Sequence, residues 1–210
     1  HFGRAGGKPT PPINMVGDFG GGGMMLAFGM SSALLNVARG GEGQVIDCAM
    51  TDGTAVLMSM MHGMKNMGVW SEDLGVNMLD TAAHFYDTYE CADGKWISIG
   101  SIEPQFYALL RKALGIDSDP AFDAQMDKSQ WPVLKAKISD IFKTKTRDEW
   151  SAIMEGTDIC YGSIQSMGEA LSHPHNVARG TFVQVNGVDQ PAPAPRFLGT
   201  PAAVPVGRKG

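Results

Sequence analysis

The chain has 210 residues, of which 43% are hydrophobic and 19% charged, a balance that predicts a packed core and not wholesale disorder. The formal net charge of -5 argues against a nucleic-acid-binding protein. Cys48, Cys91 and Cys160 are far apart and form no CxxC pair, so they indicate neither a zinc site nor a disulfide framework and favour a reducing, cytoplasmic compartment. No apolar run reaches the roughly 18 to 20 residues that span a bilayer, so no membrane partner is expected.

The first candidate site follows an irregular, Gly- and Pro-rich segment at residues 3–12. It is Gly17-Asp18-Phe19-Gly20-Gly21-Gly22-Gly23, a carboxylate beside four consecutive glycines. Glycine loses the most backbone entropy on folding, so the run indicates a sharp turn or a closely approaching ligand. Asp18 is either a helix cap or a functional base or nucleophile. The run lacks the Gly-Lys-Ser/Thr ending of a phosphate-binding loop and the GxGxxG spacing of a dinucleotide-binding motif.

The next part of the chain predicts two apolar helices with a strand between them. Residues 24–38 are apolar and end at Arg39-Gly40-Gly41, which is typical of a helix C-terminus. Residues 43–50 have the character of a buried strand, and a second helix follows from Thr51 to about Met67. This helix–strand–helix order predicts an α/β layer.

Both predicted helices are rich in methionine, which makes up 14 residues of the chain. Flexible thioethers either fill irregular gaps in an ordinary core or form a soft apolar surface on which an acyl chain can lie. The sequence leaves both alternatives open. The residues concerned are Met24, Met25, Met30, Met50, Met58, Met60, Met61, Met64 and Met67.

A β-hairpin is predicted in the middle of the chain, where Ala92-Asp93-Gly94 separates two aromatic and β-branched runs at residues 85–91 and 95–100. A helix over residues 105–114 follows, with Ser101 as its N-cap and Pro104 in its first turn. Glu103 lies at the start of this helix. It is either an acid that interacts favourably with the helix dipole or a second functional carboxylate.

The C-terminal part is predicted to contain helices at residues 131–143, 147–154 and 166–172, a strand at 181–186 and an extended tail from residue 191. His173-Pro174-His175 could suggest a metal site, but no carboxylate or cysteine lies nearby at ligand spacing. We therefore expect no metal there.

Several of these segments resemble the racemases of the family III CoA-transferase (CaiB/BaiF-type) superfamily. The resemblance is most specific from Pro12 to Met24, which contains the Gly-Asp-Phe-Gly motif. It extends in order over essentially the whole chain. The further segments that support it are residues 43–53, 92–95, 102–106, 173–182 and 191–197.

The resemblance implies an isomerase of lipid and fatty acid metabolism. Such an enzyme interconverts 2R and 2S 2-methylacyl-CoA thioesters by moving the α-proton through an enolate. An Asp and a His face opposite sides of the α-carbon. The Asp corresponds to Asp18, and Glu103 corresponds to a Glu that supports the His. The expected catalytic residues are Asp18 and Glu103, and the expected substrate-binding residues are Gly20, Gly21, Gly22, Gly23, Met24, Met50 and Ile102.

The resemblance also implies a domain organisation. A Rossmann-like large α/β domain would include residues 1–50 and the returning segment 181–210. Residues 51–84 would form a helical linker and residues 85–180 a small α+β domain. Two such chains would interlock in a homodimer that binds acyl-CoA. No metal is expected, and no cofactor beyond the coenzyme A of the substrate.

The family's catalytic His is expected about thirty residues upstream of Asp18, whereas His1 corresponds to a non-catalytic position. We therefore expect this chain to be the C-terminal portion of such an enzyme and to be inactive alone. Two alternatives remain. One is a family III CoA-transferase in which Asp18 is a nucleophile. The other is a non-catalytic acyl-CoA-binding fragment.

Overall fold

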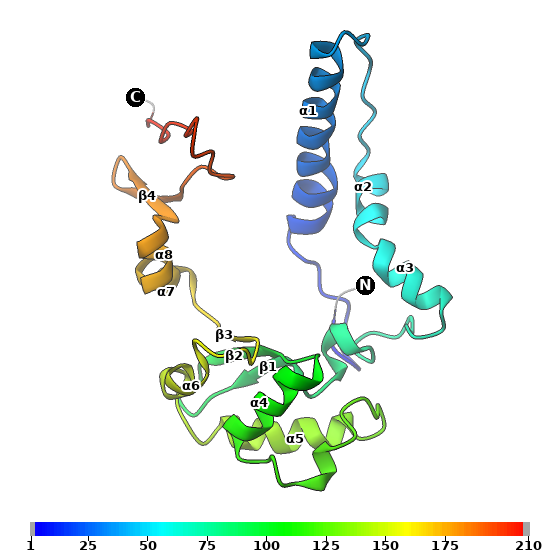
Figure 1. The fold of residues 1–210 in the computed structure, drawn as a ribbon, viewed down its shortest axis with the longest axis vertical. Coiled ribbons are helices and arrows are strands. Elements are labelled where there is room, and N and C mark those ends of the chain that lie inside the picture. Colours follow the sequence, from blue (N-terminus) through cyan, green and yellow to red (C-terminus); the bar gives the residue numbers. More distant parts are fainter. Residues whose placement is uncertain (1–2, 208–210) are drawn as a thin grey trace.

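The computed structural model describes residues 3–207, so His1 lies outside the described residues. A compact region of helices and sheet carries two arms that extend toward the same side (Figure 1). One arm contains the N-terminal helices and the other contains the C-terminal helices and hairpin.

The N-terminal arm consists of two antiparallel helical segments. A π-helical segment, η1 (Met15–Met24), continues directly into α1 (Met25–Ala38). The chain then returns beside α1 in an extended conformation and forms α2 (Met50–Leu57) and α3 (Ser59–Asn66) (Figure 1). Both predicted helices are confirmed, although the second is interrupted at Met58.

The predicted buried strand at residues 43–50 is wrong. Residues 43–49 pair with no strand in the described chain, and Val45 is 96% exposed. The run has β propensity, but this propensity needs a neighbouring strand to satisfy its backbone groups. All strand pairs among residues 3–207 are antiparallel, so the described chain has mixed helix and sheet content without a parallel α/β layer.

The continuous helix of η1 and α1 contradicts the expectation that no apolar run is long enough to span a bilayer. Met15–Ala38 forms one helix of 24 residues, and its most apolar window of 18 residues has a mean hydropathy of 1.3 and is only 6% buried. The glycine-rich turn continues the helix and makes it longer than the apolar run at 24–38 suggested. By length and composition alone this helix could cross a membrane. Core helices of soluble proteins and signal sequences meet the same criterion. The absence of a membrane partner stays a prediction.

The compact region is built on a three-stranded antiparallel sheet. Its strands are β1 (Tyr86–Glu90), β2 (Trp96–Gly100) and β3 (Tyr161–Ser163), in that order. The predicted hairpin is confirmed, with Tyr86 opposite Gly100 and Glu90 opposite Trp96. The other elements of this region are η2 (Met78–Ala82), α4 (Pro104–Leu114), η3 (Pro120–Phe122), α5 (Trp131–Phe142) and α6 (Arg147–Met154).

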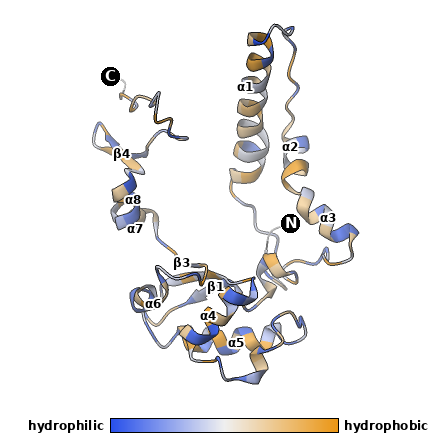
Figure 2. Ribbon diagram, viewed as in Figure 1, coloured by the Kyte–Doolittle hydropathy of each residue, from blue (hydrophilic) through white to orange (hydrophobic). Residues whose placement is uncertain are grey.

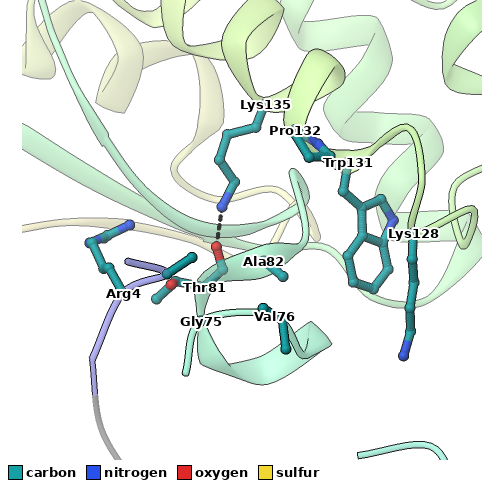
Figure 3. Close-up of a pocket in the computed structure, with 10 residues that line it drawn as sticks. Arg4, Gly75, Val76, Thr81, Ala82, Lys128, Trp131, Pro132 and Lys135 are labelled. Atoms are coloured by element: carbon teal, nitrogen blue, oxygen red, sulfur yellow. Dashed lines mark hydrogen bonds between the residues drawn. The ribbon is translucent and has the colours of Figure 1, made fainter. Parts of the chain in front are cut away.

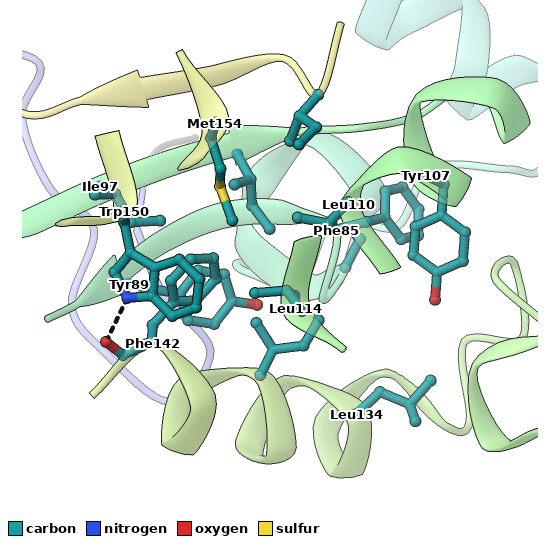
Figure 4. Packing of buried hydrophobic residues seen from close by; sticks show 14 of the residues in the cluster. Phe85, Tyr89, Ile97, Tyr107, Leu110, Leu114, Leu134, Phe142, Trp150 and Met154 are labelled. Atoms are coloured by element: carbon teal, nitrogen blue, oxygen red, sulfur yellow. Dashed lines mark hydrogen bonds between the residues drawn. The ribbon is translucent and has the colours of Figure 1, made fainter. Parts of the chain in front are cut away.

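The core lies between one face of this sheet and helices α4, α5 and α6 (Figure 4). Aromatic rings connect the layers: Tyr89 of β1 stacks on Phe142 of α5 with ring centroids 5.1 Å apart, and Phe142 meets Trp150 of α6 edge to face. The indole N–H of Trp150 donates to the carbonyl oxygen of Phe142 at 2.9 Å, so burial of this ring leaves no unpaired donor.

The helix after the hairpin begins one residue earlier than predicted, and its N-cap is a different residue. Its N-cap is Glu103, and Pro104 occupies the first helical position as expected. Ser101 is fully buried instead, and its hydroxyl donates to the carbonyl oxygen of Ile159. The helix ends at Gly115, whose φ of 70° is a conformation that glycine adopts without strain.

A buried ionic cluster ties the N-terminal segment to the sheet. Asp87 of β1 points to the core side, and its side chain is only 3% exposed. Arg4 donates to both carboxylate oxygens at 3.0 and 2.9 Å, and Lys135 of α5 donates at 2.7 Å. Burial by itself would raise the pKa of Asp87, but these hydrogen bonds outweigh it and hold the pKa below its usual value.

The C-terminal arm contains α7 (Met167–Ser172), α8 (Pro174–Arg179) and the hairpin of β4 (Phe182–Val185) and β5 (Val188–Pro191). Helix α8 and strand β5 were not predicted. His173 is the N-cap of α8, so His173-Pro174-His175 starts a helix. Arg147 of α6 is 5% exposed and pairs with both carboxylate oxygens of Glu169, which anchors this arm to the compact region.

His84 is a completely buried histidine beside the sheet. Tyr107 donates its hydroxyl proton to the carbonyl oxygen of Phe122, so it accepts a hydrogen bond from Nε2 of His84 at 2.7 Å. Nδ1 of His84 has no hydrogen-bond partner in the described chain. Burial, and after it the positive charge of Lys135, lowers the pKa of His84 to about 4.

We expect His84 to make the protein less stable as the pH falls from about 6.5 to about 4. Between these pH values the unfolded chain binds a proton at His84 that the folded chain excludes. The free energy of unfolding is therefore lower by up to about 3 kcal/mol once the pH is below this window. The His84→Gln variant should lack this part of the pH dependence when urea unfolding is followed by circular dichroism. The matched control is His62→Gln on α3, where the side chain is exposed. Identical pH profiles for His84→Gln and the unmodified protein would contradict this expectation.

Candidate active site

Asp18 lies in the first turns of η1, with its side chain exposed. Asn14, one residue before the helix, donates from Nδ2 to Oδ2 of Asp18 at 2.9 Å. No backbone N–H donates to this carboxylate in the described chain, so the structure does not support the helix-cap alternative. Asn14 binds one carboxylate oxygen, and the other has no hydrogen-bond partner among residues 3–207, so it is free to accept a proton.

The four glycines lie within η1, where they pack against α2. A Cβ on Gly21 would lie 2.8 Å from the backbone nitrogen of Thr54, and a Cβ on Gly53 would lie 2.6 Å from the carbonyl carbon of Gly21. Both distances are shorter than real contacts allow. Two backbones therefore touch at Gly21 and Gly53, and this close helix crossing accounts for part of the glycine run.

The backbone N–H groups of the glycine run are not free to bind a ligand. The N–H of Phe19 already donates to the carbonyl oxygen of Asn14 at 3.0 Å, five residues back. In this pattern the N–H groups of Gly20 to Gly23 are used within the helix. The N–H groups without a helical partner are those at its start, Val16 to Asp18. Donors for a developing negative charge are thus available in the first turn of η1, the turn that contains Asp18.

Five of the nine methionines at residues 24–67 are exposed in the N-terminal arm, and the other four are half-buried. Met24 is 67% and Met50 is 52% exposed, and both lie where η1 meets α2. None of the nine methionines of residues 24–67 belongs to the buried core cluster. Within residues 3–207 these methionines are therefore not part of the buried core. Figure 2 shows apolar residues distributed along α1 and α2, and many of the large ones are exposed, so this arm presents an extensive apolar surface.

Glu103 and Ile102 lie in the compact region. The carbonyl oxygen of Glu103 accepts hydrogen bonds from the N–H groups of Phe106 and Tyr107, both at 3.0 Å, and its side chain is exposed. Ile102 is half-buried against the core. Cys160 lies nearby with a free thiol: burial, and after it the carboxylates of Glu103 and Asp158, raise its pKa. A raised pKa leaves a smaller fraction of the Cys160 thiol as the nucleophilic thiolate.

The structure brings the predicted site residues together in two groups. Asp18, the glycines, Met24 and Met50 form one group on the N-terminal arm, and Glu103 with Ile102 forms the other. Within residues 3–207 no hydrogen bond or ion pair joins Asp18 to Glu103. The two groups are linked by the chain itself and by the contact of Arg4 with Asp87.

Sequence reasoning missed Asn14 and the ionic cluster of Arg4, Asp87 and Lys135. Asn14 was detectable from its spacing, because a side chain four residues from Asp18 lies on the same helical face. Asp87 was detectable from strand alternation, which places it on the same side as Tyr89. Arg4 gave no comparable signal, because it lies in an irregular segment.

Two cavities open beside this ionic cluster. One has a volume of 350 Å³ and lies between Leu79, Tyr86, Gly100 and Cys160. The other has a volume of 480 Å³ and lies against α5. Neither is lined by Asp18 or Glu103. Residues 3–207 contain no group of three His, Cys, Asp or Glu side chains that could hold a metal ion.

The chain is similar to known proteins over nearly its whole length. Residues 1–207 match the family described as CoA-transferase family III. The chain is 45% identical over 202 residues to alpha-methylacyl-CoA racemase from Mus musculus and, over the same length, to the Homo sapiens enzyme; each alignment covers 96% of this chain and 53% of the relative. The chain thus spans about half the length of these curated relatives. The crystal structure of a CaiB/BaiF family protein from Brucella suis has a TM-score of 0.73 and 21% identity, covering 96% of this chain and 54% of that one, and it supports the fold alone.

Proposed function

The chain belongs to CoA-transferase family III, and from this premise we propose that it is part of an alpha-methylacyl-CoA racemase. The observation that carries the proposal is the 45% identity to two racemases over nearly the whole chain. The exposed Asp18 carboxylate, held on one side by Asn14, supplies the chemical group that such a reaction requires.

In the proposed reaction Asp18 exchanges the α-proton of a 2-methylacyl-CoA thioester. Its free carboxylate oxygen takes the proton from C2, and the electron pair of the C–H bond moves onto the thioester oxygen to form an enolate. The unpaired N–H groups at the start of η1 would stabilise that charge. Return of a proton to the opposite face of C2 gives the other epimer. Return to the same face regenerates the starting thioester.

The second acid is proposed to be a histidine outside this chain, with Glu103 supporting it. Glu103 has an exposed carboxylate without a side-chain partner in the described residues, so it is free to orient such a group. The exposed methionines around Met24 and Met50 would accommodate acyl chains of either configuration, since thioethers adapt to different shapes. The chemistry uses protein carboxylates and an imidazole, so coenzyme A enters only as part of the substrate.

The architecture is proposed on the same basis. Residues 1–50 and 181–210 would join a Rossmann-like large domain, residues 51–84 would link it to a small α+β domain at 85–180, and two chains would interlock. The exposed apolar residues of α1 fit this arrangement, because large apolar patches on a protein surface usually mark interfaces. The chain of 210 residues would then be inactive alone.

Deuterium exchange at C2 tests the proposal. The protein encoded by the complete reading frame is incubated with (2S)-2-methylacyl-CoA in D2O, and deuterium and configuration at C2 are followed together. Deuterium in both epimers is the expected result. Transfer of coenzyme A to an added carboxylate without exchange at C2 would identify a CoA-transferase with Asp18 as nucleophile. Binding without either reaction would leave only an acyl-CoA-binding role.

A further inference from the structure

The 480 Å³ cavity against α5 is the largest of the described pockets, and the proposed racemase chemistry does not use it. It lies between three segments that are far apart in sequence: the N-terminal stretch at Arg4 and Ala5, the loop from Gly75 to Ala82, and the first turns of α5 (Figure 3). A volume of this size is within the range of small-molecule sites.

The floor of the cavity is apolar. Trp131 contributes its ring, with Val76, Ala82 and Pro132 around it (Figure 3). Trp131 is 3% exposed, and its indole N–H already donates to the carbonyl oxygen of Gln125 at 2.8 Å, so its ring offers the cavity a small and purely apolar surface beside Val76, which is 39% exposed. A ligand there gains by removing hydrocarbon from water.

The rim of the cavity is positively charged. Three cations, Arg4, Lys128 and Lys135, line it, and the carboxylate of Asp87 next to them offsets one charge. Arg4 and Lys135 are held in place by Asp87. Lys128 is different: among residues 3–207 its ammonium group makes no hydrogen bond or ion pair, and it lies beside Trp131 at one end of the floor (Figure 3).

We propose that this cavity is a binding site for an apolar monoanion, of which a medium-chain aliphatic carboxylate is the simplest case. The hydrocarbon lies on Trp131 and Val76, and the carboxylate pairs with Lys128. The site is separate from the proposed acyl-CoA site, because neither Asp18 nor Glu103 lines it. The proposal does not depend on the racemase reaction.

The cavity is connected to the proposed catalytic arm through its wall. Arg4 and Ala5 form that wall, and they press so closely on Gly75 that a Cβ there would lie 2.8 Å from the carbonyl carbon of Arg4. The same segment leads along the chain to Asn14 and Asp18. Occupancy of the cavity would therefore hold this segment against the compact region.

Binding is tested with sodium octanoate on the complete protein, with the indole N–H resonance of Trp131 followed by NMR. We expect saturable shifts of this resonance. We expect neutral 1-octanol to bind about three- to fivefold more weakly, which is the contribution of one exposed ion pair to affinity.

The Lys128→Ala variant should bind octanoate more weakly by the same factor and should bind octanol with unchanged affinity. The matched control, Lys143→Ala at the other end of α5, should change neither ligand. Val76→Phe, which fills the cavity from an exposed position, should abolish binding of both.

Three results would overturn the proposal. Equal affinities of octanoate and octanol, unchanged in Lys128→Ala, would show an apolar hollow without anion recognition. Octanoate binding that survives Val76→Phe would place the ligand elsewhere. No shift of Trp131 up to millimolar octanoate, or a shift only with the CoA thioester of the same acid, would assign the cavity to an assembly contact or to the substrate site. Exchange at C2 is measured separately, so either proposal can fail alone.

Discussion

Replacing Gly53 with alanine is expected to destabilise the protein by about 2 kcal/mol. The new Cβ would overlap the Gly21 backbone in the helix crossing, and overpacking of this kind costs about 3 kcal/mol. The higher helix propensity of alanine relative to glycine offsets about 1 kcal/mol of this cost. Because the obstacle is backbone and not the end of a flexible side chain, the two helices must separate. Urea unfolding of the complete protein, followed by circular dichroism, measures the effect.

The matched control is Gly63→Ala in α3. A Cβ at Gly63 meets no atom within 4 Å, so this substitution has the helix-propensity gain without the clash and should stabilise by up to about 1 kcal/mol. The two variants therefore should differ in sign. If Gly53→Ala is as stable as Gly63→Ala, the crossing of η1 and α2 does not exist as described. Gly53→Ala should also reduce C2 exchange strongly, because a shift of about 1 Å in a catalytic group can cost about 100-fold.

The hairpin and the helices α4, α5 and α6 of the compact region could be predicted from the sequence because local signals agree there, whereas β3, η2 and η3 were not predicted. The Asp-Gly turn between two β-rich runs predicts the hairpin, and Thr146 with Glu149 forms the capping box that starts α6. In each case residues a few positions apart supply their own hydrogen bonds or turn geometry. The structure confirms these elements nearly residue by residue.

The N-terminal arm could be predicted only in part, because its structure depends on contacts that a local pattern does not contain. The run at residues 43–50 has strand character but no partner strand in the described chain. The four glycines suggested a turn near a ligand, whereas the structure uses Gly21 to approach Gly53, thirty-two positions away in the sequence. The roles of Asp18 and Glu103 came from family resemblance, since neither residue type nor spacing distinguishes a base from a cap.

Replacing Asp18 with asparagine is expected to reduce C2 exchange by about 100- to 10,000-fold, the usual contribution of a general acid or base. Asparagine has nearly the same shape, and its carbonyl oxygen can still accept the hydrogen bond from Nδ2 of Asn14. It cannot take up a proton at C2. Substrate affinity should therefore change little while kcat falls, and the α-proton should exchange with D2O at a correspondingly lower rate.

The matched control for this prediction is Asp52→Asn. Asp52 is also an exposed carboxylate in the first turn of a helix, on the neighbouring α2, so the substitution removes the same charge from the same arm. A small effect at Asp52 beside a large one at Asp18 would separate proton transfer from a general loss of negative charge. Asn14→Ala should reduce C2 exchange by about tenfold, between the effects of the other two variants. It removes one hydrogen bond to a charged group at an exposed position and leaves the base itself in place. Full activity in Asp18→Asn would exclude Asp18 as the base and, with it, the racemase mechanism proposed for this chain.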